Sequence, residues 1–290
     1  MNNNKSIDPF NKPVSFTEES YDQSSTRNLI YANPAKWKIA ANMLERYTGT
    51  APEDFQKQII LTNFQHYLDR FSVLCQDAYI TEGSAMNAVH SPEMGVSIID
   101  FSIGSPNAAL IIEILATAEP KAVLFLGLTG GLHRSLKVGD FILPTAAIRD
   151  EGSSKHFMPQ QVPALPTFKI QKFVSQMLVE SNLDYRTGVI HTTDYRFWEF
   201  DEVFKEQLYD ERALAIEMET ATLFSVGFAS KVPIGALLLV SDVPLQKDGI
   251  KTKSSANMVF QKFADLHIEI GLKSMSEIAK RGEHIRHYRW

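Results

Sequence analysis

The chain has 290 residues, of which 44% are hydrophobic and 22% are charged, and its formal net charge is −5. These values are typical of a soluble globular protein, and they exclude an electrostatic case for binding nucleic acid or an anionic membrane. The single cysteine, Cys75, excludes a disulfide framework and favours a reducing compartment. No stretch reaches the roughly 18 apolar residues of a membrane span, and the polar start does not resemble a signal peptide, so we expect a cytoplasmic protein.

Residues 1–30 are rich in Asn, Ser, Asp and Pro and show no sustained period, so we expect a mobile polar arm ahead of one catalytic domain over residues 31–290. In chain order, the hydrophobic pattern predicts helices over residues 34–47, 67–74, 108–118, 168–180, 201–209, 218–229 and 255–280. It predicts strands over residues 57–63, 86–89, 96–103, 123–126, 139–143, 185–192, 213–216 and 233–241. This alternation, without an internal repeat, predicts a single α/β domain with a mostly parallel, twisted central sheet flanked by helices.

Two carboxylate-bearing segments follow predicted strands near the end of the chain. Ser241 and Asp242 end an apolar run that is typical of a strand buried on both faces, and Glu217 and Glu219 lie where another short apolar piece gives way to a helix. Because strands of an α/β sheet deliver ligand-binding groups to their carboxyl edge, we expect the three acids to converge on one cleft and to carry acid–base chemistry. Taken singly, each segment is also explained as an ordinary helix start or turn.

Two glycine-bearing segments are placed to approach a phosphate or a sugar. The segment 104–107 opens a predicted helix, whose free amides would bind an anion or a hydroxyl, and the segment 127–131 is predicted as a second strand-to-helix turn. The candidate ligand-binding residues in them are Gly104, Asn107, Thr129 and Gly130. Neither segment matches a dinucleotide fingerprint or a Walker pattern, and a plain turn is the alternative for both.

An arginine lies among aromatic residues in the segment 195–200, just past a predicted strand. Phe197 or Trp198 would stack on a heterocyclic base, and Arg196 would pair with an anion. A core or interface patch is the alternative. The histidines lack metal-ligand spacing, so no metal site is expected.

These motifs resemble those of the AMP nucleosidases, a family within the nucleoside phosphorylase superfamily. The matching segments extend from about residue 34 to about residue 275, and they include residues 103–108, 130–132, 193–199, 217–219 and 241–242. The resemblance implies a nucleoside phosphorylase-like fold and hydrolysis of the N-glycosidic bond of AMP to adenine and ribose 5-phosphate. It also implies a small-molecule nucleotide substrate, no cofactor, and a homo-oligomer, often a hexamer.

Residue by residue, the resemblance implies that Glu219 binds the sugar hydroxyls and that Met218 lies under the ribose ring. Asp242 matches the acid that protonates N7 of the leaving adenine, and Phe197 matches an aromatic residue that stacks on the base, with Trp198 as the neighbouring candidate. The reaction also needs a carboxylate that stabilises the ribosyl cation and orients water. Glu217 is the best candidate for that role, although the sequence does not separate its role from that of Glu219.

Two segments depart from the pattern of the phosphorylases in the superfamily. The residues 125–129 lack the arginine of their phosphate-binding strand, and Thr62-Asn63-Phe64 replaces their early Gly-Asp-Pro turn with its arginine. Both changes remove ligands for a nucleophilic phosphate, which favours water as the nucleophile. The cations nearest the site motifs, and hence the candidates for holding the 5′-phosphate, are Arg196, Lys251 and Lys253.

Two other functions stay open at this point. One is a purine nucleoside phosphorylase or nucleosidase that acts on an unphosphorylated nucleoside. The other, from a different class, is a nucleotide-binding protein without turnover.

Overall fold

The computed structural model describes residues 33–281, so the predicted arm over residues 1–30 lies outside the described residues. The helices are α2 (Pro34–Thr48), α3 (Gln65–Leu74), α4 (Ser105–Leu115), α5 (Phe168–Glu180), α6 (Glu202–Glu211), α7 (Thr220–Ala229), α8 (Lys253–Lys262) and α9 (Ala264–Arg281). The strands are β1 (Gln58–Thr62), β2 (Tyr79–Glu82), β3 (Asn87–Ser91), β4 (Val96–Asp100), β5 (Ala122–Gly131), β6 (Phe141–Asp150), β7 (Tyr185–Thr193), β8 (Ala215–Glu217) and β9 (Ile234–Asp242). Within the described range, no helix combines the length and the apolar character that crossing a bilayer requires.

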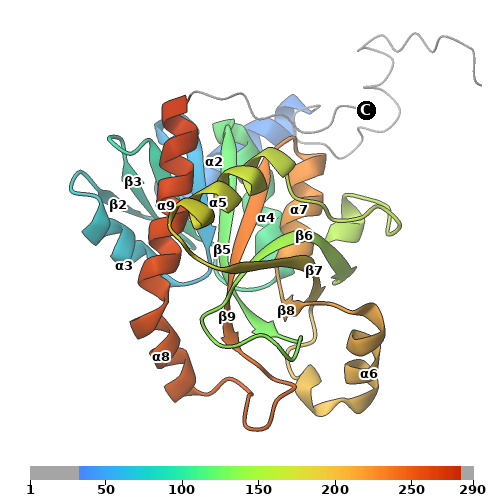
Figure 1. The fold of residues 1–290 in the computed structure, drawn as a ribbon. Coiled ribbons are helices and arrows are strands. Elements are labelled where there is room, and N and C mark those ends of the chain that lie inside the picture. The colour runs from blue at the N-terminus through green and yellow to red at the C-terminus, as the bar shows by residue number, and fades with distance from the viewer. Residues whose placement is uncertain (1–32, 282–290) are drawn as a thin grey trace, which may run out of the picture.

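The strands of this range form one twisted sheet with helices on both sides (Figure 1). Their order is β2-β3-β4-β1-β5-β8-β7-β6-β9, and β9 also pairs with β5. The strands β5, β8, β7, β6 and β9 therefore form a closed ring. Five of the nine pairings are parallel, among them those of β1 with β4 and β5 and that of β5 with β9. The predicted α/β fold with a flanked central sheet is confirmed.

The central strands are buried on both faces, and alternate residues of β5 show this directly. Val123 and Phe125 belong to one apolar cluster, together with residues of α2, α4 and α7. Leu124 and Leu126 belong to the other, together with residues of α3, α5 and α9. Because side chains alternate across a strand, a strand covered by helices on both faces reads as a continuous apolar run. The polar residues that end such strands are therefore held on a rigid support.

Two predicted elements are wrong. The segment 127–131 is not a turn but the second half of β5, because its backbone pairs with β9 and with β8. The predicted helix over residues 255–280 is broken at Phe263, where φ is −127° and ψ is −26°, into α8 and α9. The ring of Phe263 packs against Gly139, where an added Cβ would lie 2.6 Å from it, so tertiary packing turns the chain at this point.

Candidate active site

Neighbouring strand ends bring the predicted acids together. Asp242 ends β9 and Glu217 ends β8, and Gly130 of β5 pairs with Asp242 on one side and with Ile216 on the other. The register of β5 and β9 shifts between Thr129 and Gly130, so one residue of β9, Ser241, is left over as a bulge. The expected convergence of the two acidic segments at one edge of the sheet is what the structure contains.

The carboxyl group of Asp242 is part of a chain of polar contacts. The hydroxyl of Ser241 donates to Oδ1 of Asp242 at 2.6 Å, and Nζ of Lys251 donates to Ser241 Oγ at 3.3 Å. Burial raises the pKa of Asp242, against the Ser241 hydrogen bond and the charges of Lys251 and Arg196, which lower it. Burial likewise lowers the pKa of Lys251. A carboxyl group with a raised pKa is suited to donate a proton near neutral pH.

The positive charge of Arg196 lies close enough to Asp242 to lower the pKa of that carboxyl group. Glu199 holds the guanidinium of Arg196 in place. Nη1 of Arg196 donates to Oε1 of Glu199 at 2.9 Å, while Cζ lies 5.6 Å from the ring centroid of Phe197. The side chain of Glu199 is buried, and its Oε2 has no hydrogen-bond partner within the described part of the chain.

The two aromatic residues predicted to stack on the base have different surroundings. Trp198 is buried in an apolar cluster with Leu132, Leu208 and Ile216. Phe197 is 67% exposed. Of these two rings, Phe197 is therefore the one that a ligand can reach.

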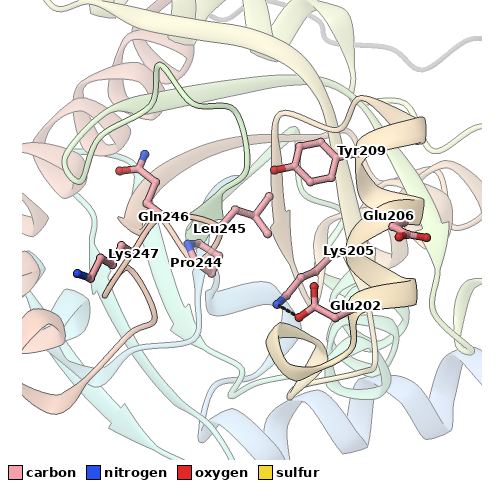
Figure 2. A pocket seen from close by; sticks show the side chains of 8 residues that line it. All are labelled: Glu202, Lys205, Glu206, Tyr209, Pro244, Leu245, Gln246 and Lys247. Carbon is pink, nitrogen blue, oxygen red and sulfur yellow. Dashed lines mark hydrogen bonds and ion pairs between the residues drawn. The ribbon is translucent and has the colours of Figure 1, made fainter.

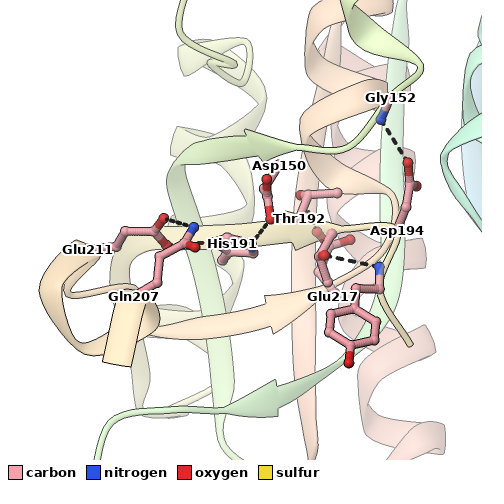
Figure 3. A network of polar contacts seen from close by, with 10 residues as sticks. Asp150, Gly152, His191, Thr192, Asp194, Gln207, Glu211 and Glu217 are labelled. Atoms are coloured by element: carbon pink, nitrogen blue, oxygen red, sulfur yellow. Dashed lines mark hydrogen bonds and ion pairs between the residues drawn. The ribbon is translucent and has the colours of Figure 1, made fainter. Parts of the chain in front are cut away.

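Glu217 is surrounded by protein donors. Its Oε1 accepts a hydrogen bond from the hydroxyl of Thr192 on β7, and its Oε2 accepts the N–H groups of Glu219 at 2.8 Å and Thr220 at 2.7 Å. Figure 3 shows Thr192 and Glu217 side by side on neighbouring strands. Because both oxygens are engaged within the protein, these contacts do not support the predicted role of Glu217 in orienting water.

Glu219 joins the turn before α7 to the turn before α4. Its Oε1 accepts the N–H of Gly104 at 2.7 Å, and Ser105 Oγ donates to the carbonyl oxygen of Met218 at 2.8 Å. Burial, together with the nearby charge of Glu217, raises the pKa of Glu219 to about 8. The amide of Gly104, which the sequence predicts as a ligand-binding group, is thus used by Glu219.

The remaining predicted site residues divide into two groups. Thr129 and Gly130 lie at the strand junction, where Thr129 Oγ1 donates to Ile216 O at 2.7 Å and an added Cβ on Gly130 would lie 3.2 Å from Pro244. Asn107 donates to Ile103 O at 2.9 Å, and Lys253 is exposed at the start of α8. Their contacts with a ligand stay predictions.

Three residues at this edge were missed as functional candidates: Thr192, Glu199 and Asn63. The side chain of Asn63, just past β1, faces Glu219 and acts to lower its pKa, and Asn63 Oδ1 is buried with no hydrogen-bond partner among residues 33–281. Glu199 lies inside the aromatic segment 195–200 and Thr192 lies three residues before it, and this proximity in the sequence is the signal that could have pointed to them.

A buried histidine lies next to Thr192 on β7. Nδ1 of His191 is 2.6 Å from Glu211 Oε2, and its Nε2 is 3.3 Å from Asp150 Oδ2, so the imidazole lies between two carboxylates (Figure 3). At the end of the same strand, Asp194 accepts the N–H of Gly152 at 2.7 Å. These contacts fix the end of β7 from which Thr192 reaches Glu217.

The larger cavity, of about 410 Å³, lies beside this edge between α6 and the segment that follows Asp242 (Figure 2). It is lined by Glu202, Lys205, Glu206, Tyr209, Pro244, Leu245, Gln246 and Lys247. A second cavity, of about 250 Å³, lies beside the segment 149–160. Neither of the two is lined by Asp242, Glu217 or Glu219.

Comparison with known proteins adds independent support for the family. AMP nucleosidase of Escherichia coli (strain K12) is 29% identical over 286 residues, with 83% of this chain covered. The match covers 59% of that relative, so the chain spans about six tenths of its length. Guanosine phosphorylase of Halorubrum lacusprofundi is 28% identical, with 60% of this chain and 73% of the relative covered.

Solved structures give the same picture. The crystal structure of AMP nucleosidase from Bacteroides thetaiotaomicron VPI-5482 is 39% identical, has a TM-score of 0.75, and covers 85% of this chain and 98% of its own. Uridine phosphorylase from Vibrio fischeri ES114, at 20% identity and a TM-score of 0.70, covers 78% of this chain and 94% of its own, and shares the fold.

The family model of the Phosphorylase superfamily matches residues 79–272, the range that contains both acidic segments and the aromatic segment. The predicted superfamily is confirmed, and the chain belongs to the Phosphorylase superfamily.

Proposed function

We propose that this protein hydrolyses the N-glycosidic bond of AMP and releases adenine and ribose 5-phosphate. The observation that carries the proposal is the placement of Asp242, a carboxyl group with a raised pKa, beside the two cations Lys251 and Arg196. The end of β9 thus combines a carboxyl group that can protonate the leaving base with two positive charges that can bind a phosphate. The similarity to AMP nucleosidases of two bacteria supports the same substrate.

Departure of adenine is the step that Asp242 would assist. Cleavage passes through a cationic ribosyl group, so the rate depends on protonation of the leaving base. Because Ser241 donates to Oδ1 of Asp242, Oδ2 is the oxygen that would carry the proton to N7. Phe197, exposed next to Arg196, would stack on the base.

The ribose would lie against the turn 217–219. Glu219, fixed by Gly104, would bind the sugar hydroxyls, and the half-buried Met218, between the two buried acids, would lie under the ring. The negative charge shared by Glu217 and Glu219 would stabilise the cationic ribosyl group as it forms.

The 5′-phosphate would be held by Arg196 and Lys251. The guanidinium of Arg196 uses Nη1 for Glu199, which orients its other nitrogen atoms, and its side chain is 50% exposed. Lys251 is directed toward Ser241 and lies over the ring of Phe64 at 5.9 Å. Lys253, which is exposed at the start of α8, is the weaker candidate.

Water is the nucleophile that the neighbouring strands favour. The segments 62–64 and 125–129 are the two that depart from the phosphorylase pattern. They lie close together, because β1 and β5 are parallel and Leu61 of β1 pairs with Phe125 of β5. Both segments lack a cationic residue, and Phe125 and Leu126 are buried. This pair of strands therefore offers no charge that would hold an inorganic phosphate.

Product analysis tests the proposal. AMP, adenosine and inosine are each incubated with the protein, with and without inorganic phosphate, and the products are separated by chromatography. The expected products of AMP are adenine and ribose 5-phosphate without added phosphate. Formation of ribose 1,5-bisphosphate, or cleavage only of the unphosphorylated nucleosides and only with phosphate, would identify a phosphorylase instead. The homo-oligomeric state stays a prediction that light scattering would check.

A further inference from the structure

The hydroxyl of Thr192 lies at the centre of a hydrogen-bonded frame around the turn 217–221. Thr192 of β7 is opposite Glu217 of β8 in a parallel ladder. Its Oγ1 donates to Oε1 of Glu217 and accepts the N–H of Ala221 at 2.9 Å. One buried side chain thus contacts both the acid that ends β8 and the first turn of α7.

The frame accounts for the backbone amides at the start of α7. The first N–H groups of a helix have no partner within the helix. Here Glu217 Oε2 accepts the N–H groups of Glu219 and Thr220, and Thr192 Oγ1 accepts that of Ala221. Three successive amides are therefore bound by two side chains, and those side chains are bound to each other. Loss of the Thr192 hydroxyl would release one amide and one carboxylate oxygen together.

The position of Glu219 depends on this frame. Its backbone N–H is fixed by Glu217, and its side chain is fixed from the other side by Gly104 at 2.7 Å. A group that binds a transition state must be held within a fraction of an ångström, because a 1 Å misplacement can cost about 100-fold in rate. A shift of the turn would move the carboxyl group of Glu219 away from its partner.

We propose that Thr192 is a positioning residue which, through Glu217, sets the contact of Glu219 with the 2′-hydroxyl of the ribose. This assignment rests on the proposed function, because it takes Glu219 as the residue that binds the sugar hydroxyls. Glu217 then acts through the turn and not on the attacking water.

The test compares AMP with 2′-deoxy-AMP, which lacks the hydroxyl in question. The variants are Thr192→Val, which keeps the shape and loses the hydroxyl, and Thr192→Ser, which keeps the hydroxyl. Thr222→Val is the matched control, because Thr222 is equally buried, lies in α7, and has a hydroxyl for which the described residues provide no hydrogen-bond partner. Circular dichroism and thermal unfolding check the fold of each variant.

We expect the unmodified protein to prefer AMP, and Thr192→Val to lose about 10–100-fold in kcat/KM on AMP but less than about threefold on 2′-deoxy-AMP. Thr192→Ser should restore most of the loss, and Thr222→Val should match the unmodified protein on both substrates. If Thr192→Val does not fold, Thr192→Ala, which also removes the hydroxyl that Glu217 and the Ala221 amide contact, should give the same substrate-selective loss.

Each contrary result has its own meaning. An equal loss on both substrates would overturn the inference, since Thr192 would then support the fold alone. Equal cleavage of both nucleotides by the unmodified protein would also overturn it and would leave AMP hydrolysis standing. If AMP is not cleaved, the proposed function fails, and calorimetric affinities for the two nucleotides decide the inference. A preference for AMP that Thr192→Val abolishes supports it, and no preference overturns it.

Discussion

The carboxyl group of Glu219 accepts the backbone N–H of Gly104 at 2.7 Å and so connects two turns that are 115 positions apart in the sequence. Gly104 has a φ of +100°, a conformation that residues with a side chain rarely adopt. The contact that orients the predicted ribose-binding acid therefore depends on a backbone conformation open to glycine.

Gly104→Ala tests this dependence. We expect a loss of about 1–2 kcal/mol in unfolding free energy from backbone strain, and a fall in kcat/KM because the amide no longer meets Glu219. Gly95→Ala is the matched control, since Gly95 also has a positive φ, of +67°, and lies near α9, where an added Cβ would be 3.3 Å from Ala279. Denaturant unfolding should show a loss in both variants, with reduced activity in Gly104→Ala alone. Reduced activity in both would point to a general effect of stability.

Asp242→Asn should lower kcat by about 10²–10⁴-fold, the usual contribution of a positioned general acid, with little change in nucleotide affinity. Because the acid must be protonated and its pKa is raised by burial, activity should fall as the pH rises through that pKa. Steady-state rates between pH 5 and pH 9 check both points. Unchanged kcat in the variant would assign the proton donor to another residue.

Arg196→Ala should lose about 2–4 kcal/mol in kcat/KM on AMP, as expected for removal of a charge-assisted phosphate contact. Activity on adenosine, which has no phosphate, should be nearly unchanged. Measurement of kcat/KM for Arg196→Ala on AMP and on adenosine shows whether the loss is specific to the phosphorylated substrate. If the losses were equal, Arg196 would contact the base or support the fold, and Lys251 would be the next cation to test.

The buried pair Tyr67–His267 should make the fold sensitive to acid. The hydroxyl of Tyr67 is 2.8 Å from Nδ1 of His267, whose Nε2 is 2.9 Å from Leu237 O, and burial lowers the pKa of His267 to about 4. A neutral native imidazole stabilises the fold above the ordinary pKa of about 6.5, and this contribution is lost as the pH falls toward 4. The expected loss is about 3 kcal/mol for this group.

Thermal unfolding between pH 7 and pH 4 checks this expectation. In His267→Gln, the midpoint should fall less steeply with decreasing pH than in the unmodified protein. His133→Gln, at an exposed histidine, is the control and should keep the original slope. If the unfolding midpoint fell equally steeply with decreasing pH in both variants, other groups, such as the buried His90, would control the loss of stability in acid.

Much of the fold could be predicted because local pattern and tertiary structure agree there. The predicted helix over residues 168–180 is α5 with the same bounds, and the predicted strand over residues 233–241 differs from β9 by one residue at each end. These bounds depend on periodicity, which a sequence carries. The expectation that Glu217, Glu219 and Asp242 meet at one edge assumed that their strands run in the same direction. The structure brings the two segments together differently, because β8 is antiparallel to β5 and β9 is parallel to it, and Gly130 of β5 pairs with both Ile216 and Asp242.

The rest depends on long-range contacts. The glycines of residues 127–131 suggest a turn, but pairing with β8 and β9 keeps them extended. Thr192 is an ordinary strand residue by its propensity, and its contact with Glu217 depends on the pairing of β7 with β8. Trp198 and Phe197 are equivalent in the sequence, and only the fold buries one and exposes the other.

Closure of the strand ring limits how this chain can associate by adding strands. Each strand of the ring pairs with at least two neighbours, and Thr192 itself is paired on both sides, with Arg149 of β6 and with Glu217 of β8. Among the strands of residues 33–281, β2 is the one with a partner on one side alone, and it is only four residues long. Short edge strands are poor templates for strand addition. The position of Thr192, with a partner strand on each side, is thereby not available for pairing with another chain.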